Sequence, residues 1–382
     1  MNGVTGLSGN LWPVHLKPYS NELLSSWMLR LAHAHGLKLQ TFYSIIFDKN
    51  KSIWNRDIDK FAPDWLINRL SSATGTSIQD VTHTTLKSYE GILYETHQPK
   101  GNTRWINPIG IYHRTHKNFG LQFCPICLAH DQDPYFRKYW RLAFFTECEK
   151  HHVLLHDRCP RCGSAVNFHR VEMGIRELVK PRSVINCFKC GYDLRDAPIA
   201  RISCDDWQTS ITYRTLLDFH ELGWSFTDNI TIQYSHQLFD VLRHLCVLIS
   251  SNRRASCLLP FIARKLGIDA SAIERSRFTP FEKCNVYDRH ILFHCAIWLI
   301  LDWPRRFVEV CNSYNLTSAY LLQDYVDSPF WFYSVIDTYL NHSQYSPTNE
   351  EINAAKTYLI HSGKKAGVTK ISRLMGFTTL KR

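Results

Sequence analysis

The chain has 382 residues, of which 45% are hydrophobic and 21% are charged, and its lysines and arginines exceed its acidic residues by 11. This composition excludes a disordered or collagen-like chain, and the length suits two or three domains with a hydrophobic core. The excess of positive charge favours a polyanionic partner but does not indicate a fold.

The sequence shows neither a secretory signal nor a membrane span. Residues 1–10 lack a basic start and an apolar segment, and the longest apolar run, residues 291–301, is too short to cross a bilayer. We therefore expect a cytoplasmic protein without membrane association. Thiols stay reduced in that compartment, so the 13 cysteines favour metal binding over disulfides.

The first hundred residues predict two pairs of short helices. Each pair is split by a glycine, Gly36 in the first and Gly75 in the second, and Ser20 is the predicted N-cap of the first helix. This outline is typical of helix-turn-helix units. An ordinary helical bundle explains it equally well, so DNA contact stays open here. The helices are expected over residues 22–32, from Leu39 onward, over 64–73 and over 77–88.

Seven cysteines and one histidine form four half-sites in which two residues separate the ligands. A two-residue spacing lets a tight turn direct both side chains at one ion, and the glycines after the last two half-sites permit the backbone to curl beneath the sulfurs. Tetrahedral sets of thiolate and imidazole select Zn²⁺. The half-sites are Cys124/Cys127, Cys148/His151, Cys159/Cys162 and Cys187/Cys190.

Pairing consecutive half-sites gives two complete ligand sets. The first holds Cys124, Cys127, Cys148 and His151, and the second holds Cys159, Cys162, Cys187 and Cys190. Interleaved pairing stays open, but consecutive half-sites close shorter loops. His152 is an alternative to His151 as the fourth ligand. Four ligands leave no open coordination position, so we expect two structural Zn²⁺ ions rather than catalytic ones.

Two segments of this region could either contact nucleic acid or have a purely structural role. The aromatic run 139–145 predicts a small core for the first zinc module rather than a base-stacking platform. The loop between the last two half-sites carries a basic excess that favours a solvated face over phosphate contact. Its basic residues are Arg170, Arg176, Lys180 and Arg182.

Helical patterns dominate the remainder, and the six other cysteines are expected to be buried or inert. The expected helices cover 213–222, 236–250, 258–266, 288–301, a restart near Pro304, 318–326, 350–359 and 368–375. We expect a mainly α fold with small zinc-stabilised modules. The predicted domains are a helix-turn-helix-like unit at 1–103, tandem zinc fingers at 104–202 and a helical unit at 203–382, with a second helix-turn-helix outline at 350–382.

Motifs for common enzyme chemistry are missing. There is no Walker A loop, no G-x-S-x-G and no H-E-x-x-H. His151, His152, Asn167 and His169 resemble an HNH nuclease, but the last two are too close together for that motif. A zinc-containing nuclease is therefore the weakest of three hypotheses, and we predict no catalytic residue.

Several motifs together resemble one family. The chain is similar to the TniQ/TnsD transposition proteins over about residues 12–195. Beyond residue 205 the similarity is loose. The matching motifs are residues 17–22, 25–27 and 31–36, Phe123 to Leu128, 139–142, Cys148 with His151, Leu155, and the two Cys-x-x-Cys-Gly half-sites at 159–163 and 187–191.

This resemblance implies a non-catalytic adaptor. Such proteins connect a target-choosing component to the AAA+ ATPase that recruits the transposase. Some bind a specific DNA site themselves, and others dock, often as homodimers, on a CRISPR RNA-guided effector complex. The sequence does not decide between these modes. The alternative function is a freestanding zinc and helix-turn-helix transcription regulator.

Overall fold

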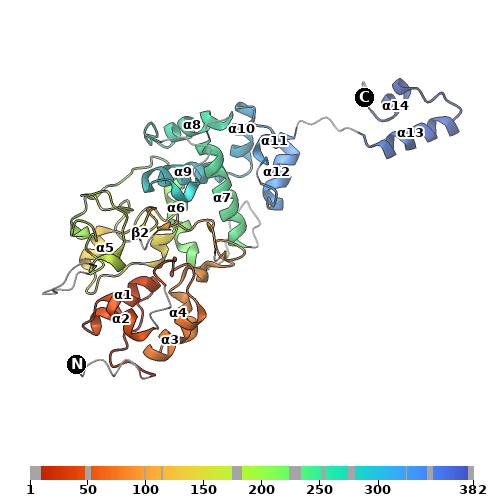
Figure 1. Cartoon of the computed structure of the whole chain (residues 1–382). Coiled ribbons are helices and arrows are strands. Elements are labelled where there is room, and N and C mark those ends of the chain that lie inside the picture. The colour runs from red at the N-terminus through yellow and green to blue at the C-terminus, as the bar shows by residue number, and fades with distance from the viewer. Residues whose placement is uncertain are drawn as a thin grey trace.

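The computed structural model describes residues 10–47, 53–98, 100–112, 115–173, 183–222, 234–251, 254–273, 280–323, 325–341 and 347–376. Within these ranges the chain is mainly helical, as predicted (Figure 1). The described strands form one two-stranded antiparallel ribbon, β1 (Ile111–Tyr112) and β2 (Thr115–His116). No described helix combines the length and hydropathy needed to cross a membrane.

Four helices form the N-terminal part, in the two predicted pairs. The glycine turns are confirmed, because Gly36 and Gly75 adopt positive φ angles of 67° and 61°. Ser77 caps the fourth helix by accepting a hydrogen bond from the Asp80 backbone N–H. The helices are α1 (Leu24–Ala34), α2 (Leu39–Ile46), α3 (Asp64–Thr74) and α4 (Ile78–His83).

Two predictions in this part are wrong. Ser20 does not cap α1, because Glu22 bonds back to the Tyr19 backbone N–H and the helix begins only after Leu23. Helix α4 ends at His83, and the separate 3₁₀ turn η2 (Leu86–Tyr89) follows it. The hydroxyls of Thr84 and Thr85 bond backbone carbonyls three residues earlier, which competes with continuation of the helix.

The middle of the chain has little regular structure. Its helical pieces are α5 (Pro125–His130) and the 3₁₀ turns η3 (Lys138–Arg141), η4 (Phe168–Arg170) and η5 (Leu194–Asp196). The aromatic run 139–145 is buried, so its prediction as a core segment is confirmed. Residues 174–182 lie outside the described residues, and with them Arg176, Lys180 and Arg182.

Helix α9 is the centre of the C-terminal part. It packs against α6, α7, α8 and α10, and it is buried on nearly every side. The helices here are α6 (Trp207–Leu222), α7 (Ser235–Ser250), α8 (Leu258–Lys265), α9 (Val286–Ile300), α10 (Arg305–Ser313), α11 (Ser318–Leu321) and α12 (Phe330–Leu340), with 3₁₀ turns η6 (Arg254–Cys257) and η7 (Phe281–Lys283).

The structure differs from the predicted helices at α6, which begins at Trp207 rather than near residue 213, and at α11 and α12. Helix α11 is shorter than predicted, and α12 was not predicted. Its aromatic start, Phe330 to Tyr333, has low helix propensity, although Phe332, Ile336 and Leu340 carry the four-residue spacing of a buried face. Of the six other cysteines, Cys246, Cys295 and Cys311 are buried as expected, whereas Cys204, Cys257 and Cys284 are half-buried.

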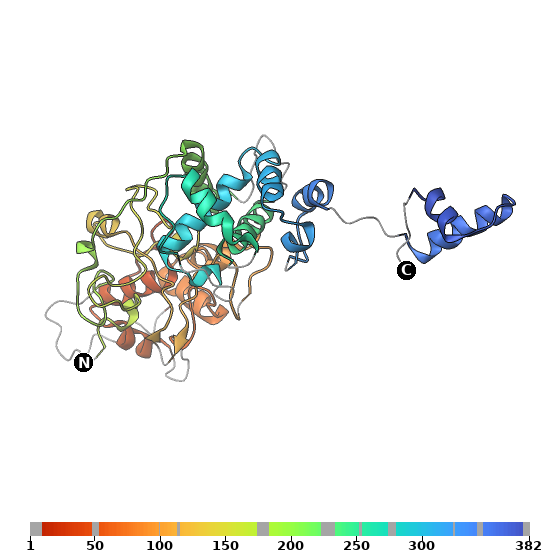
Figure 2. The ribbon, with the colours of Figure 1, turned by 90° about the horizontal axis from the view of Figure 1, so that it is seen from above.

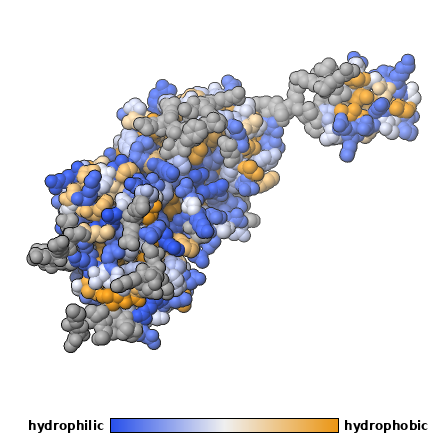
Figure 3. Space-filling view, in the orientation of Figure 1, coloured by the Kyte–Doolittle hydropathy of each residue, from blue (hydrophilic) through white to orange (hydrophobic). Residues whose placement is uncertain are grey.

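The last two described helices pack on each other and lie apart from the other elements in two views (Figures 1 and 2). They are α13 (Asn349–His361) and α14 (Val368–Leu374), both as predicted. Figure 3 shows hydrophobic colour on this pair, and Ile360 of α13 and Val368 of α14 are exposed. Residues 377–382, the predicted start of a third helix, lie outside the described residues.

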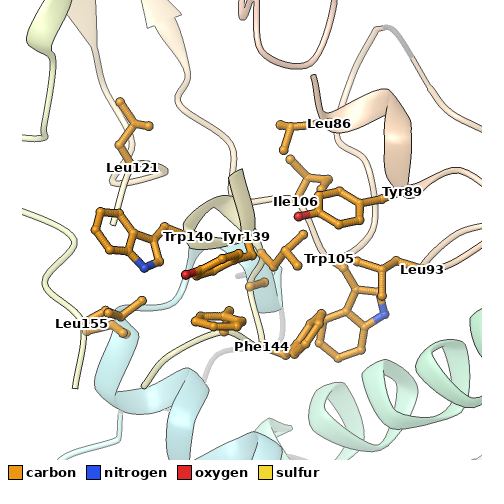
Figure 4. Packing of buried hydrophobic residues seen from close by; sticks show 14 of the residues in the cluster. Leu86, Tyr89, Leu93, Trp105, Ile106, Leu121, Tyr139, Trp140, Phe144 and Leu155 are labelled. Atoms are coloured by element: carbon orange, nitrogen blue, oxygen red, sulfur yellow. The ribbon is translucent and has the colours of Figure 1, made fainter. Parts of the chain in front are cut away.

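One aromatic core joins the middle of the chain to the C-terminal helices (Figure 4). Trp105 is fully buried, and its ring contacts Phe144, Phe239, Phe281 and Phe293 edge-on. Its indole N–H donates to the Phe239 carbonyl at 3.1 Å. The core therefore depends on residues about 130 to 190 positions later in the chain as well as on nearer ones such as Phe144.

Candidate metal centres

The first predicted ligand set comes together beneath the start of α5. The ligand atoms of all four side chains lie within 4.8 Å of one another, and Cys124, Cys127 and Cys148 are buried. The Nδ1 atom of His151 is 3.5, 3.3 and 3.4 Å from the three sulfurs in chain order. A Zn²⁺ ion with bonds of about 2.0 to 2.3 Å separates tetrahedral ligand atoms by roughly 3.5 to 3.8 Å, so the set has the right size.

The second predicted set also comes together. Cys159 and Cys190 approach to 3.6 Å, and so do Cys162 and Cys187. All four sulfurs lie within 4.8 Å of one another. Both groups follow the consecutive pairing of half-sites rather than the interleaved one. Each group could hold one metal ion.

Three of the four half-sites share one backbone frame. Counting the first cysteine as position 1, its N–H donates to the carbonyl of position 6, and the N–H of position 5 donates back to its carbonyl. An antiparallel bridge between the flanking residues closes each turn, pairing Glu147 with Leu154, Arg158 with Ala165, and Asn186 with Asp193. The three frames, here called knuckles, begin at Cys148, Cys159 and Cys187.

The fifth position of each knuckle needs a left-handed backbone. Gly163 and Gly191 supply it with φ angles of 67° and 71°, whereas the first knuckle places His152 there at 50°. The frame therefore directs His152 away from the sulfurs. Its side chain is 48% exposed, and its Nδ1 bonds Glu147 at 3.2 Å. His151, not His152, contributes to the first cluster.

The fourth half-site differs, because it stands at a helix N-terminus. Cys124 is the N-cap of α5, Pro125 occupies the first turn, and the Cys124 sulfur accepts the Cys127 N–H at 3.5 Å. The neighbouring Cys124 and Cys127 thiols also hold the pKa of Cys148 far below its usual value. The pKa values of Cys124 and Cys127 are raised instead, so the three sulfurs favour one negative charge among them, and a bound metal cation would favour thiolates at all three.

The resemblance motif at residues 17–22 builds the N-terminal part rather than a catalytic site. Lys17 donates to carbonyls at the end of α3, those of Thr74 and Gly75. Buried Glu22 forms a bidentate pair with Arg30 at 2.8 Å. The Arg30 guanidinium also lies 3.7 Å from the centre of the Tyr19 ring. These contacts hold residues 17–22 against α1 and α3.

A buried ionic network joins this part to the aromatic run. Arg141 is fully buried and bonds Asp57 at 2.6 Å and Asp59 at 3.4 Å. Asp59 accepts both the N–H and the hydroxyl of Ser25 in α1. Burial and the adjacent Asp57 carboxylate raise the pKa of Asp59 to about 7, while Arg141 lowers that of Asp57 despite its burial. Sequence reasoning missed this network, because the chain separates its members by about 30 to 80 positions.

Other candidate residues do not assemble into a site. His169 stacks on Trp54 with ring centres 4.8 Å apart, and Asn167 is buried. His151 belongs to the first cluster, so the described residues show no HNH arrangement. Arg170, from the basic loop, donates to the Thr115 hydroxyl.

Residues 13–155 match the family model TniQ. A comparison with curated proteins finds no match. The matched segment contains the 17–22 motif, the Arg141 network and the whole first cluster, whereas the second cluster follows it. Proteins with this domain are associated with transposition. The similarity to TniQ therefore covers residues 13–155, which are less than half of the chain.

Proposed function

We propose that this protein is a non-catalytic adaptor in DNA transposition. It would link target selection, by DNA sequence or by an RNA-guided effector complex, to the AAA+ ATPase that recruits the transposase. The family match over residues 13–155 carries this proposal. An adaptor needs fixed surfaces rather than a reactive centre, and both clusters offer complete four-ligand sets of the structural kind.

We further propose that both clusters bind Zn²⁺, the first through Cys124, Cys127, Cys148 and His151 and the second through Cys159, Cys162, Cys187 and Cys190. The donor chemistry and the ligand spacing support this assignment. Bound zinc would fix the knuckles in a region with little regular structure. Elemental analysis of protein purified without chelators should give two zinc ions per chain. Zinc-free, folded protein would refute the assignment.

The remaining expectations belong to the same proposal. The units 1–103, 104–202 and 203–382 would act as modules of a cytoplasmic adaptor that contacts DNA and works as a homodimer. The helix pair α13 and α14 supports the alternative of a freestanding transcription regulator, because two short helices joined by a turn are typical of DNA-binding units.

A capture experiment tests the proposed function. Immobilised full-length protein is offered the AAA+ ATPase and the transposase encoded with it, and a cell-based assay counts transposition events with and without the protein. We expect capture of the ATPase and loss of targeted events on deletion. Tight binding to one operator sequence, without ATPase capture and without effect on transposition, would favour the regulator.

A further inference from the structure

A cleft of about 600 Å³ opens where the three parts of the chain meet. One wall comes from residues 55–61, between α2 and α3, and another from 100–111, before and within β1. Lys283, at the end of η7, contributes from the C-terminal part. The cleft shares no residue with either candidate metal centre, and no sequence motif indicates it.

Positive side chains dominate this cleft. Arg56, Lys60, Lys100 and Lys283 line it, against one carboxylate, that of Asp57. That carboxylate is already neutralised, because Arg141 bonds it at 2.6 and 3.2 Å. Arg56, Lys100 and Lys283 are exposed, and none of them forms an ion pair with another described residue. The cleft therefore has an uncompensated positive charge.

Lys60 sets this cleft apart from a merely basic surface. Its side chain is almost fully buried, yet its ammonium forms no ion pair with a carboxylate of the described residues and donates to the Gly101 carbonyl at 2.6 Å. That bond uses one of three N–H donors. Burying a cation without a directly bonded carboxylate is costly, and the nearby Asp57 carboxylate is already bonded by Arg141. An anion in the cleft would therefore stabilise the Lys60 ammonium.

Amide side chains add uncharged donors at the same place. Asn55 and Asn102 are exposed in the cleft, and Asn118 is half-buried beside Gly110. The exposed Phe61 ring stands at the rim, with the Arg56 guanidinium 5.7 Å from its centre. Lysine, arginine and amide donors around a hollow are the groups that contact phosphate oxygens in nucleic acids.

We propose that this cleft binds the phosphodiester backbone of a nucleic acid strand. This inference rests on the proposed function only in that it gives the expected DNA contact a surface. The cleft offers charge and amide donors but no element to enter a groove, so the contact is independent of base sequence. Phe61 would add a stacking surface where the strand is single.

The test measures binding of full-length, zinc-loaded protein to fluorescent DNA of random sequence, as a duplex and as a single strand, across a salt series. The variant Arg56→Gln/Lys100→Gln/Lys283→Gln removes three charges from the cleft. The control Arg214→Gln/Arg264→Gln/Lys265→Gln removes three exposed charges from α6 and α8. Zinc content and circular dichroism establish that both variants are folded.

We expect the cleft variant to lose at least tenfold in affinity at low salt, and its log–log salt slope to decrease by about 2 to 3, since each lost phosphate contact removes about 0.9. The control should change little. Equal losses in both variants, or none in either, would overturn the proposal. Preference for the duplex or for the single strand identifies the form of the strand.

ATPase capture by the same variants separates this inference from the proposed function. Retained capture with weakened DNA binding supports the cleft as a nucleic-acid surface. Lost capture with unchanged DNA binding would refute it and show a surface for an acidic protein. Should the wild type capture no ATPase, the proposed function fails, and the DNA measurement still decides the role of the cleft.

Discussion

The two metal centres use the same knuckle in different surroundings. In the first cluster the three cysteines are at most 3% exposed, and the loop between its half-sites contains the buried aromatic run. In the second, Cys162 and Cys190 are partly exposed. The first lies within the TniQ match and the second beyond it. The same knuckle therefore belongs to a buried core in the first cluster and to a more exposed segment in the second.

The variant Cys148→Ser, with the largest expected effect, tests whether the first cluster is part of the core. Structural zinc sites contribute about 10 to 16 kcal/mol of apparent binding free energy, and the proposed first site is continuous with the core. We expect the variant to lose one zinc and to unfold globally, with loss of helical circular dichroism and of the ordered tryptophan environment. A cooperative, native-like unfolding transition in this variant would show that the first centre is not part of the core.

Cys187→Ser tests whether the second cluster can be lost without unfolding the core. We expect one zinc per chain, faster proteolysis and hydrogen exchange between residues 156 and 200, and a retained transition for the aromatic core. The reason is that two of its cysteines, Cys162 and Cys190, are partly exposed, and that η5, just after the last half-site, packs on α5 of the first cluster. Global unfolding here, equal to that of Cys148→Ser, would abolish the distinction.

Arg141→Met should destabilise the first cluster more than the second, because the Arg141 network reaches the first cluster through the aromatic run. Removing one partner of a buried ion pair costs about 3 to 5 kcal/mol. Urea unfolding should show this loss, with zinc leaving the first cluster at lower urea than the second. Arg158→Met breaks a partly exposed pair with Asp157 and should cost about 1 kcal/mol or less. Similar costs for both variants would contradict the network's role.

The pH dependence of unfolding should separate the stability of the core from the retention of metal. Burial lowers the pKa of His294 to about 4 and that of His290 well below its usual value. Because the folded pKa is depressed, each histidine's contribution is complete above about pH 6.5 and decreases toward pH 4, by about 1.4 kcal/mol per pH unit. Between pH 7 and 5.5 we expect a loss of roughly 1 to 3 kcal/mol.

His294→Gln provides the comparison for this pH effect. Urea unfolding of the variant should have a shallower pH dependence than the wild type, whatever its absolute stability. A zinc-sensitive dye in the same samples reports metal release separately. Identical pH slopes for the two proteins would show that His294 titrates normally in the folded state.

The smallest expected effect concerns the fifth position of the first knuckle. His152→Gly should raise stability by about 1 kcal/mol without changing zinc content, because glycine adopts positive φ without a Cβ penalty. The reverse change, Gly163→Ala, should destabilise by a similar amount through the backbone alone, since no atom lies within 4 Å of the added Cβ. Loss of zinc from His152→Gly would instead identify His152 as a ligand.

Local signals in the sequence predicted the ligand groups and most of the helices. The four half-sites depend on two-residue spacings, which the knuckle frame translates directly into geometry. The glycine turns at Gly36 and Gly75 are equally local. The division into three domains stays a prediction, as do the ions themselves.

Features that depend on distant residues were not predictable in the same way. Nothing near Arg141 indicates its partners Asp57 and Asp59, and the cleft around Lys60 takes its walls from three parts of the chain. Helix α12 carries a usable four-residue spacing, but its aromatic start masks the signal. Ser20 had the right residue type for a cap, and the Glu22 side chain made another turn more favourable.

The surroundings of Trp105 have a consequence for synthesis on the ribosome. Its ring is enclosed by phenylalanines as far along the chain as Phe281 and Phe293. The nascent segment 13–155 therefore leaves the exit tunnel with one side of this indole exposed, and it stays so until α9 has been translated. A fragment ending at residue 155 would keep that apolar face permanently open, so we expect it to aggregate where the full chain stays in solution.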